Sequence, residues 1–419
     1  MPNQSERASV IRQLESLFEY MIIFDEDETS DFDDLMTLLG FVESSRYINL
    51  RNYETNKRSL NDLLWEYSDK NFRQIVRMEK SSFQRLLTII SGHPVFNRAT
   101  RNRYTHYVAK QAPVWIQLMV VLIRLGCHGN GVSVGHVGRL CGYSLGSVVN
   151  FTNRVFTAIL SLEKEFVRWP NAHERKKISK RFQRRYGIPG VGIIDGTHVI
   201  FAQKPHIDGE TYWCRKQFYS SNVILICNDK GSIIFYVIGW PGSLYDYTIF
   251  DKTKLVRFPE RYFSPGEFVL ADAGFALKWY CITPYRHPAA ELPENKIFNH
   301  YFSSARVTIE HVNGWLKNRF SSLRGIRTQI RIKSDFELVN KHVLVCLILH
   351  NILLKFKDEQ FDEPDDDFDV IDGDVDDVED IDAAAYEEEM LRYKNEPQEL
   401  KAYVHEELYL WINTQLDDI

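Results

Sequence analysis

The hydrophobic pattern of the chain changes its period once along its length. Between residues 60 and 162 apolar side chains recur at spacings of three and four, as in FRQIVRMEKSSFQRLLTII, which is the period of an amphipathic helix. From residue 187 onwards, short β-branched runs bounded by Gly, Asp or Pro replace this pattern, and such runs are typical of strands. The pattern therefore predicts an all-helical region followed by a region built on a sheet.

The second region has strand signals first and helical signals afterwards. The predicted strands cover residues 190–200, 222–228, 232–238 and 268–271, and the predicted helices cover residues 305–320 and 336–356. Strands followed by helices that pack on them indicate an α/β domain with a mixed sheet flanked by helices.

One segment of the helical region has the form of a helix-turn-helix. Residues 132–160 predict two helices joined at residues 141–143, with Ser144 or Ser147 placed to cap the second helix. In a DNA-binding motif the second helix would present Ser147, Asn150 and Asn153 to the major groove. An ordinary helical hairpin fits the same spacing equally well.

Composition divides the chain further. We expect the following segments: an acidic and helical N-terminal extension (1–59), a helical domain (60–170), a basic linker (171–186), the sheet-containing domain (187–357), an acidic disordered linker (358–392) and a C-terminal helix (393–419).

The net charge of −6 conceals a strong segregation of charge. Residues 358–389 contain 18 acidic residues and no Lys or Arg, which leaves the other 387 residues at +12. A run of like charge this long repels itself and predicts a disordered linker. A second interpretation is that this run competes with DNA for the basic surface of the protein.

A basic run stands between the two main regions. Residues 173–185, HERKKISKRFQRR, contain seven positive charges. Such a run is typical of a phosphate-contacting patch or of a nuclear-import signal, although a solvated helix face has the same composition. The candidate DNA-binding residues here are Arg175, Lys176, Lys177, Lys180 and Arg181.

The sequence also speaks against several other classes of protein. No run of 18 apolar residues predicts a membrane span, and the N-terminal residues lack the pattern of a signal peptide. The six cysteines are scattered without a C-x-x-C pair, which argues against a zinc cluster and a disulfide framework. We expect an intracellular protein, in the nucleus and also the cytoplasm, with no membrane partner.

Three acids stand where hard metal ions could be held. We expect Asp195 and Asp272 at the ends of buried strands, and Glu310 at the edge of an apolar helix stripe. Two divalent metals roughly 3.5 to 4 Å apart can activate a nucleophile and stabilise a leaving oxygen in phosphodiester cleavage. Acids at strand ends are also common turn formers, so spacing alone does not decide between these roles.

Six motifs in a fixed order resolve that choice. They are IDGTHV at 194–199, GWPGSLYDYTIF at 239–250, LADAGFAL at 270–277, ITPYR at 282–286, FNHYFSSARVTIEHVNGWLKNRFSSLRG at 298–325 and LHNILL at 349–354. Over residues 100 to 355 the chain resembles the PIF/Harbinger family of DDE transposases. The resemblance implies an RNase H-like fold, cut-and-paste DNA chemistry with Mg2+ or Mn2+, and the catalytic and metal-binding triad Asp195, Asp272 and Glu310.

The resemblance leaves one carboxylate position open. Asp246 competes with Asp272 for the middle place, because the family also has an Asp there. Asp272 is favoured, since it follows a predicted buried strand and precedes the Glu310 helix, and Asp246 is kept as a further metal ligand. The LADAGF motif departs from the family, which more often has a Gly before and a Ser after this Asp.

Cations around Glu310 complete the predicted site. Arg306 lies one turn before Glu310 and can reach Glu310 or a phosphate. Lys317 and Arg319 follow Glu310 and are candidate DNA contacts, although a solvated helix face has the same composition. His350 and Asn351 in a strongly apolar helix predict buried polar residues that fix packing.

The resemblance also suggests a Myb-like DNA-binding partner protein and a homo-oligomer assembled on DNA. The leading hypothesis is an active transposase. The alternatives are a host-adopted nuclease and a catalytically idle DNA-binding or scaffold protein.

Overall fold

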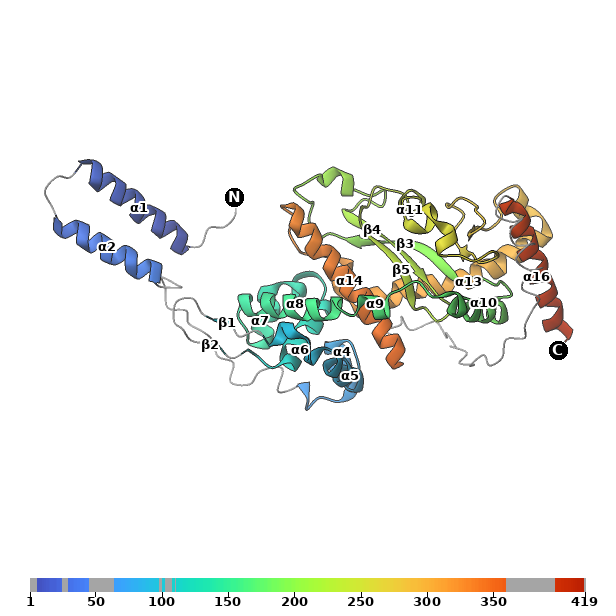
Figure 1. Cartoon of the computed structure of the whole chain (residues 1–419), viewed down its shortest axis with the longest axis horizontal. Coiled ribbons are helices and arrows are strands. Elements are labelled where there is room, and N and C mark those ends of the chain that lie inside the picture. Colours follow the sequence, from blue (N-terminus) through green and yellow to red (C-terminus); the bar gives the residue numbers. More distant parts are fainter. Residues whose placement is uncertain are drawn as a thin grey trace. The chain divides into compact units, whose positions relative to one another are not determined.

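The computed structural model describes residues 6–24, 29–44, 64–97, 100–101, 108–109, 111–358 and 396–417. These residues fall into two compact units. The first comprises Met1–Arg58 with Arg98–Gln111, and the second comprises Ser59–Asn97 with Ala112–Ile419. The second unit therefore contains both the predicted helical region and the predicted sheet (Figure 1).

The described residues of the first unit form two helices and two short paired strands. Helix α1 (Glu6–Phe24) packs against α2 (Thr29–Ser44), and Leu35 and Val42 are buried between them. Strands β1 (Thr100–Arg101) and β2 (Val108–Ala109) pair in antiparallel fashion.

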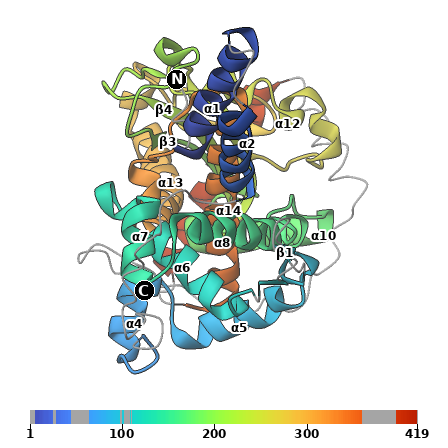
Figure 2. The same cartoon turned by 90° about the vertical axis from the view of Figure 1, so that its left-hand side faces the viewer.

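The helical part of the second unit surrounds one apolar helix. Figure 2 shows α6 among its neighbours, and nine of its thirteen residues are buried. The helices of this part are α4 (Asp69–Val76), α5 (Lys80–Ser91), α6 (Val114–Gly126), α7 (Val134–Cys141), α8 (Leu145–Leu160) and α9 (Glu163–Phe166).

Helices α7 and α8 form the two helices predicted at residues 132–160. Helix α7 ends at Gly142, whose φ of 74° suits a residue without a β-carbon, and Ser144 caps α8 by accepting a hydrogen bond from the Ser147 amide. Asn150 and Asn153 are exposed, as expected, whereas Ser147 is half-buried and bonds to Ser144. The DNA contact of this helix stays a prediction.

The sheet has five strands in the order β5-β4-β3-β6-β7. Strands β3, β4 and β5 pair antiparallel, whereas β6 and β7 continue from β3 in parallel. This mixed sheet flanked by helices confirms the predicted RNase H-like α/β fold. The strands are β3 (Gly192–Ile200), β4 (Ser220–Cys227), β5 (Ile233–Pro241), β6 (Val269–Leu270) and β7 (Cys281–Ile282).

Alternate residues of β3 face two different layers of helices. Ile193 and Val199 belong to the larger core, on the face covered by α13 (Pro293–Arg319) and α14 (Lys333–Phe356). Ile194 belongs to a second core, on the face covered by α11 (Asp246–Phe250) and α12 (Lys254–Arg257). Figure 1 shows the sheet between α11 on one side and α13 with α14 on the other.

The segment predicted to be a basic linker is a well-packed helix, α10 (Ala172–Tyr186). Asn171 and Glu174 form a capping box at its start, and the Tyr186 hydroxyl lies 2.7 Å from the Thr308 hydroxyl of α13. Ile178 and Phe182 are buried at helical spacing, so this segment packs as a helix in spite of its seven cations, and the prediction of a linker was wrong.

Helix α14 carries the buried polar residues expected of a core helix. Asn351 accepts a hydrogen bond from the Ile233 amide and donates to the Ile233 carbonyl, and His350 donates to the Gly231 carbonyl. Within the described residues, α14 is the helix long and apolar enough to cross a membrane, and 67% of its most apolar window is buried inside the protein.

The predicted acidic linker, residues 358–392, includes one residue that belongs to the folded core. Asp358 is buried and forms an ion pair of 2.7 Å with Arg319, so it belongs to the folded core. The rest of the predicted acidic linker, residues 359–392, lies outside the described residues. The C-terminal helix is α16 (Pro397–Asp417), whose residues Leu400, Val404 and Leu408 join the larger core.

Candidate active site

Asp195 lies in the middle of β3, whereas the sequence predicted it at the end of a strand. The expectation of a sharp turn after Gly196 was wrong because β3 continues to Ile200 against β4. Ile193 pairs with Leu270 of β6 in parallel register. Two residues further along both segments, Asp195 is therefore level with Asp272.

Two side chains of α13 contact the Asp195 carboxylate. Asn313 donates a hydrogen bond to Oδ2 at 3.0 Å, and Arg306 lies 3.5 Å from Oδ1. The pKa of Asp195 is raised to about 6, mainly by burial; the charge of Arg306 opposes this rise, and the charges of Asp246 and Asp272 add to it. Asp246 and Asp272 therefore each lie close enough to Asp195 for their charges to act on its carboxylate.

Glu310 lies on the stripe of α13 that faces this cluster. Arg306, Glu310, Asn313 and Lys317 are spaced by four, three and four residues, so they fall within roughly 60° around the helix axis. Arg306 and Asn313 both contact Asp195, and Lys317 donates to the Thr197 hydroxyl at 2.5 Å. Glu310 itself is exposed and lies between these residues along the stripe, and its role as a metal ligand stays a prediction.

Asp246 approaches the site from the other face of the sheet. It begins α11, and its carboxylate lies against Gly196, where any β-carbon would overlap it. Asn222 of β4 donates to Asp246 Oδ1 at 2.6 Å and to the Leu244 carbonyl at 2.9 Å. Gly196 is therefore required for the close approach of Asp246 to the residue next to Asp195.

Asp272 follows β6 at the start of a short loop. The Gly274 amide donates to its carboxylate, and the Arg286 guanidinium donates to the carbonyls of Ala273 and Phe275. The small residues around Asp272 therefore keep the tight turn, even though LADAGF departs from the family pattern.

The side-chain oxygen atoms at this site are of the chemical type that binds divalent cations. The Oδ1 atoms of Asn313 and Asn222 are buried without a hydrogen-bond partner and lie beside Asp195 and Asp246. Carboxylate and amide oxygens are the ligands that Mg2+ prefers. Within the described ranges, however, no three acidic, His or Cys side chains stand close enough to hold one ion as they are.

Other polar side chains border the acids. Thr197 is held by Lys317, and His198 Nδ1 lies 3.0 Å from the Ser220 hydroxyl. Burial lowers the pKa of Lys317 to about 8, and the charges of Lys216 and Arg324 add to this effect. Asn313 and Asn222 are not among the residues predicted from the sequence, although the helical spacing of Asn313 from Arg306 and Glu310 is a signal that identifies the first.

Three of the predicted DNA-binding cations have partners inside the protein. Arg175 is buried and contacts Glu267 at 2.5 Å, and Arg319 is buried against Asp358, so both are structural and the prediction for them was wrong. Arg181 forms two hydrogen bonds with Asp229. The sequence of a basic run does not show which of its side chains face the core and which face solvent.

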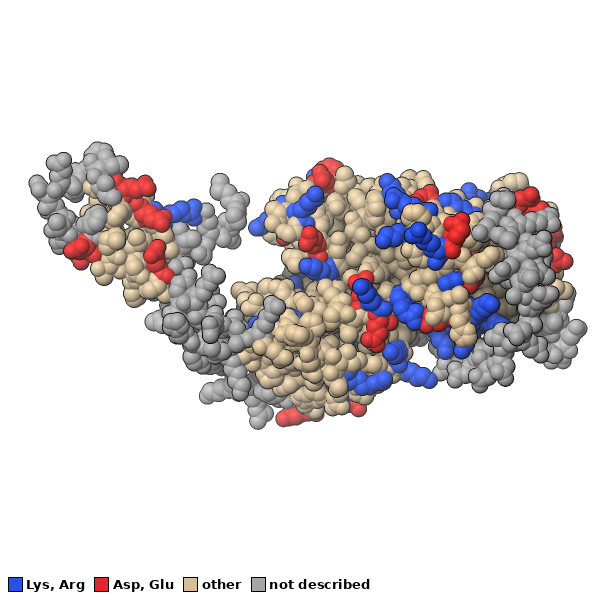
Figure 3. Space-filling view, viewed as in Figure 1, with Lys and Arg blue, Asp and Glu red and all other residues tan. Residues whose placement is uncertain are grey.

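The remaining cations stay at the surface. Lys176 and Lys177 of α10 are exposed, and Lys180 is half-buried. Figure 3 shows Lys and Arg side chains gathered around α10 on the face in view. The phosphate contact of these residues stays a prediction.

Comparisons with known proteins agree with this arrangement. A protein-family model described as DDE superfamily endonuclease matches residues 194–351. The putative nuclease HARBI1 of Homo sapiens is 27% identical over 237 residues, which cover 56% of this chain and 66% of that protein. HARBI1 of Bos taurus has the same identity and coverage.

A plant protein matches a longer stretch. Protein ALP1-like of Arabidopsis thaliana is 22% identical over 315 residues, covering 70% of this chain and 73% of that protein. The chain matches just under two thirds of the length of the HARBI1 proteins. No solved structure matches it. The mixed sheet, the acids on it and these matches together show that residues 194–351 are similar to DDE superfamily endonucleases and that the chain is similar to the HARBI1 and ALP1-like proteins.

Proposed function

We propose that this protein is a metal-dependent DNA endonuclease of the transposase type, which cuts phosphodiester bonds and joins strands by a DDE two-metal mechanism. The observation that carries the proposal is the position of Asp195. It lies level with Asp272, beside Asp246, and under the helix stripe that presents Glu310.

The acids have the role of metal ligands in this proposal. Asp195, Asp272 and Glu310 would hold Mg2+ or Mn2+, with Asp246 as a further ligand. The bound ions supply an activated water or 3′-hydroxyl and stabilise the leaving oxygen. A cation would also relieve the repulsion that contributes to the raised pKa of Asp195.

The cations of α13 have the role of phosphate contacts. Arg306 and Lys317 lie one and two turns away from Glu310 on the same stripe, so a phosphate at Glu310 would lie between them. Arg306 keeps its buried Nε atom without a hydrogen-bond partner, and a phosphate oxygen would satisfy it.

The wider assignments are proposals that rest on this one. The exposed lysines of α10 suit non-specific contact with the DNA backbone. We propose action in the nucleus, a Myb-like DNA-binding partner protein, and assembly of several copies on DNA, as the family resemblance implies.

Cleavage by the purified protein tests the proposal. Plasmid DNA and fragments are incubated with the protein in Mg2+, Mn2+, Ca2+ or a chelator, with and without nuclear extract as a source of partner protein. We expect nicks or breaks in Mg2+ and Mn2+ and none in the chelator. Binding without cleavage under every condition would contradict the nuclease.

A second candidate is a catalytically idle DNA-binding or scaffold protein derived from such a nuclease. One observation favours it: the Asp195 carboxylate is already contacted by Asn313 and Arg306, with no three ligand groups converging within the described residues. The same assay separates the two candidates.

A further inference from the structure

Two exposed tyrosines flank Asp246. Tyr245 is 54% exposed and Tyr247 is 44% exposed, yet their rings are stacked, with centroids 5.7 Å apart and planes at 14°. Exposed aromatic side chains of this size are not needed for the core, because Ile249 and Phe250 of the same helix are the residues buried there.

A positive charge lies beside this pair. The Arg215 guanidinium lies 5.6 Å from the centroid of the Tyr245 ring, within the range of a cation–π contact. Burial lowers the pKa values of His198 and Lys317, and the charge of the adjacent Lys216 lowers both further, so Lys216 lies near these two residues. The rings therefore lie on either side of Asp246 in the chain, with Arg215 beside Tyr245 and Lys216 near His198 and Lys317.

The rings are held close to the acids by the backbone between them. Asp246, the residue between the two tyrosines, rests its carboxylate on Gly196, the neighbour of Asp195. Asn222 bonds both to Asp246 and to the Leu244 carbonyl, which fixes the segment that carries both rings. A DNA strand whose phosphate lies at the acids would thus have its bases within reach of the rings.

We propose that Tyr245 and Tyr247 form a stacking platform for an unpaired base of the DNA strand that is cut. Aromatic side chains with Arg nearby bind unpaired bases, whose flat faces in a duplex are covered by stacking on their neighbours. Stacked planes lie roughly 3.4 Å apart, so a base inserted between the two rings would require them to be roughly 7 Å apart. The ring centroids are only 5.7 Å apart, and the base therefore stacks on the outer face of the pair.

This inference rests on the proposed function and refines it. The substrate becomes DNA with a locally unpaired strand beside the cut phosphate, rather than intact duplex alone. Trp213, which is 45% exposed, packs edge-on against Tyr219 and is not part of the platform.

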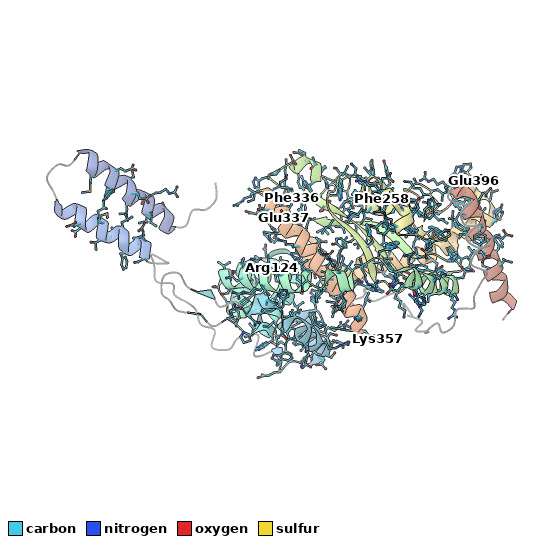
Figure 4. All side chains as sticks on the ribbon, in the orientation of Figure 1. Arg124, Phe258, Phe336, Glu337, Lys357 and Glu396 are labelled. Atoms are coloured by element: carbon cyan, nitrogen blue, oxygen red, sulfur yellow. The ribbon has the colours of Figure 1, made fainter. Side chains whose placement is uncertain are left out.

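Binding to two DNA probes tests the platform without any cleavage. The full chain is titrated in Ca2+ with a duplex that carries a short unpaired flap, labelled with a fluorescent adenine analogue, and with its fully paired counterpart. The variants are Tyr245→Ala, Tyr247→Ala, Tyr247→Leu and Tyr247→Phe. Phe258→Ala is the matched control, because Phe258 (labelled in Figure 4) is 46% exposed with Arg261 at 4.9 Å from its ring.

The wild type and Tyr247→Phe are expected to quench the flap fluorescence and to prefer the flapped DNA. Each alanine variant and Tyr247→Leu are expected to bind the flapped DNA about tenfold more weakly and the paired DNA unchanged. Equal binding of both probes by the wild type, or an unchanged preference in the alanine variants, would overturn the inference.

The proposed nuclease can fail separately. If the wild type never cuts DNA but prefers the flapped probe, and Tyr247→Ala loses this preference, the platform is supported and the nuclease is not. A protein that cuts with no flap preference has the nuclease and lacks the platform.

Discussion

Two cationic side chains, Lys317 and Arg306, are placed to bind DNA phosphates at the proposed site. Lys317 lies at the C-terminal end of the stripe of α13, donates a hydrogen bond to the Thr197 hydroxyl and is close to Asp195, while Arg306 contacts Asp195 directly. Both cations are therefore fixed in place before a substrate arrives, and this preorganisation lowers the cost of ordering them on binding.

The first prediction concerns the salt dependence that Lys317 contributes. Lys317→Gln removes one phosphate contact while keeping a donor for Thr197, so DNA affinity should fall and the slope of log affinity against log salt should drop by about 1. Lys355→Gln is the control, since this exposed lysine pairs with Glu165 on α9. A slope identical to that of the wild type would mean that Lys317 does not contact phosphate.

At the scale of elements, α13 is fixed at its end by one buried ion pair. Arg319 and Asp358 are almost fully buried, 2.7 Å apart, and Asp358 also accepts a hydrogen bond from the Glu79 amide at the start of α5. The same Arg319 donates to the Arg77 carbonyl. The helix that carries Glu310 is thereby joined to the helical region.

The second prediction concerns the loss of one partner from this buried ion pair. Asp358→Asn leaves a buried guanidinium uncompensated, so the free energy of unfolding should fall by about 3–5 kcal/mol. Removing the exposed Lys355 to Glu165 pair should cost no more than about 1 kcal/mol. Denaturant unfolding measures both, and equal small effects would contradict a structural role for Asp358.

The third prediction concerns pH and the buried His350 of α14. Burial lowers the pKa of His350 to about 4 from an ordinary 6.5. Between pH 6.5 and 4, His350 binds a proton in the unfolded chain but stays neutral in the folded protein. Stability that is present above pH 6.5 is therefore lost as the pH falls towards 4, by on the order of 3 kcal/mol.

A neutral replacement isolates this effect. His350→Gln can still donate to the Gly231 carbonyl but does not titrate, so its stability should fall less steeply between pH 6.5 and 4. Unfolding curves at several pH values measure the two slopes. Parallel curves for wild type and variant would show that His350 is not the group responsible.

The elements also show where sequence reasoning ends. Periodicity predicted α7, α8, α13 and the strands, because the face of an element that is buried carries apolar residues at a regular spacing. It misplaced Asp195 at the end of a strand, since Gly196 looks like a turn residue but serves the approach of Asp246. It also missed that Arg175 and Arg319 have buried acidic partners distant in sequence.

At the scale of the whole molecule, charge segregation is the main feature. The acids of residues 359–389 follow directly on the buried Asp358, and α16 returns to the core beyond them. A tethered acidic segment would compete with DNA phosphates for the basic surface of the folded part.

The fourth prediction tests that competition. Replacing residues 359–389 with a neutral Gly-Ser segment of equal length keeps Asp358 and α16 in place. Affinity for DNA of arbitrary sequence should rise severalfold at low salt and return to the wild-type value at high salt, where charges are screened. Affinity that is unchanged at low salt would remove the competition hypothesis.

The most direct test of the whole account is the rate of metal-dependent DNA cleavage in a matched set of variants. The set is Asp195→Asn, Asp272→Asn, Glu310→Gln and Asp246→Asn, with Asp251→Asn as the control because Asp251 is half exposed and pairs with Lys278. We predict that the first three lose cleavage by at least about a hundredfold while still binding DNA, that Asp246→Asn is impaired less, and that Asp251→Asn cuts normally. Cleavage that survives in Asp195→Asn or Glu310→Gln would contradict the proposed site.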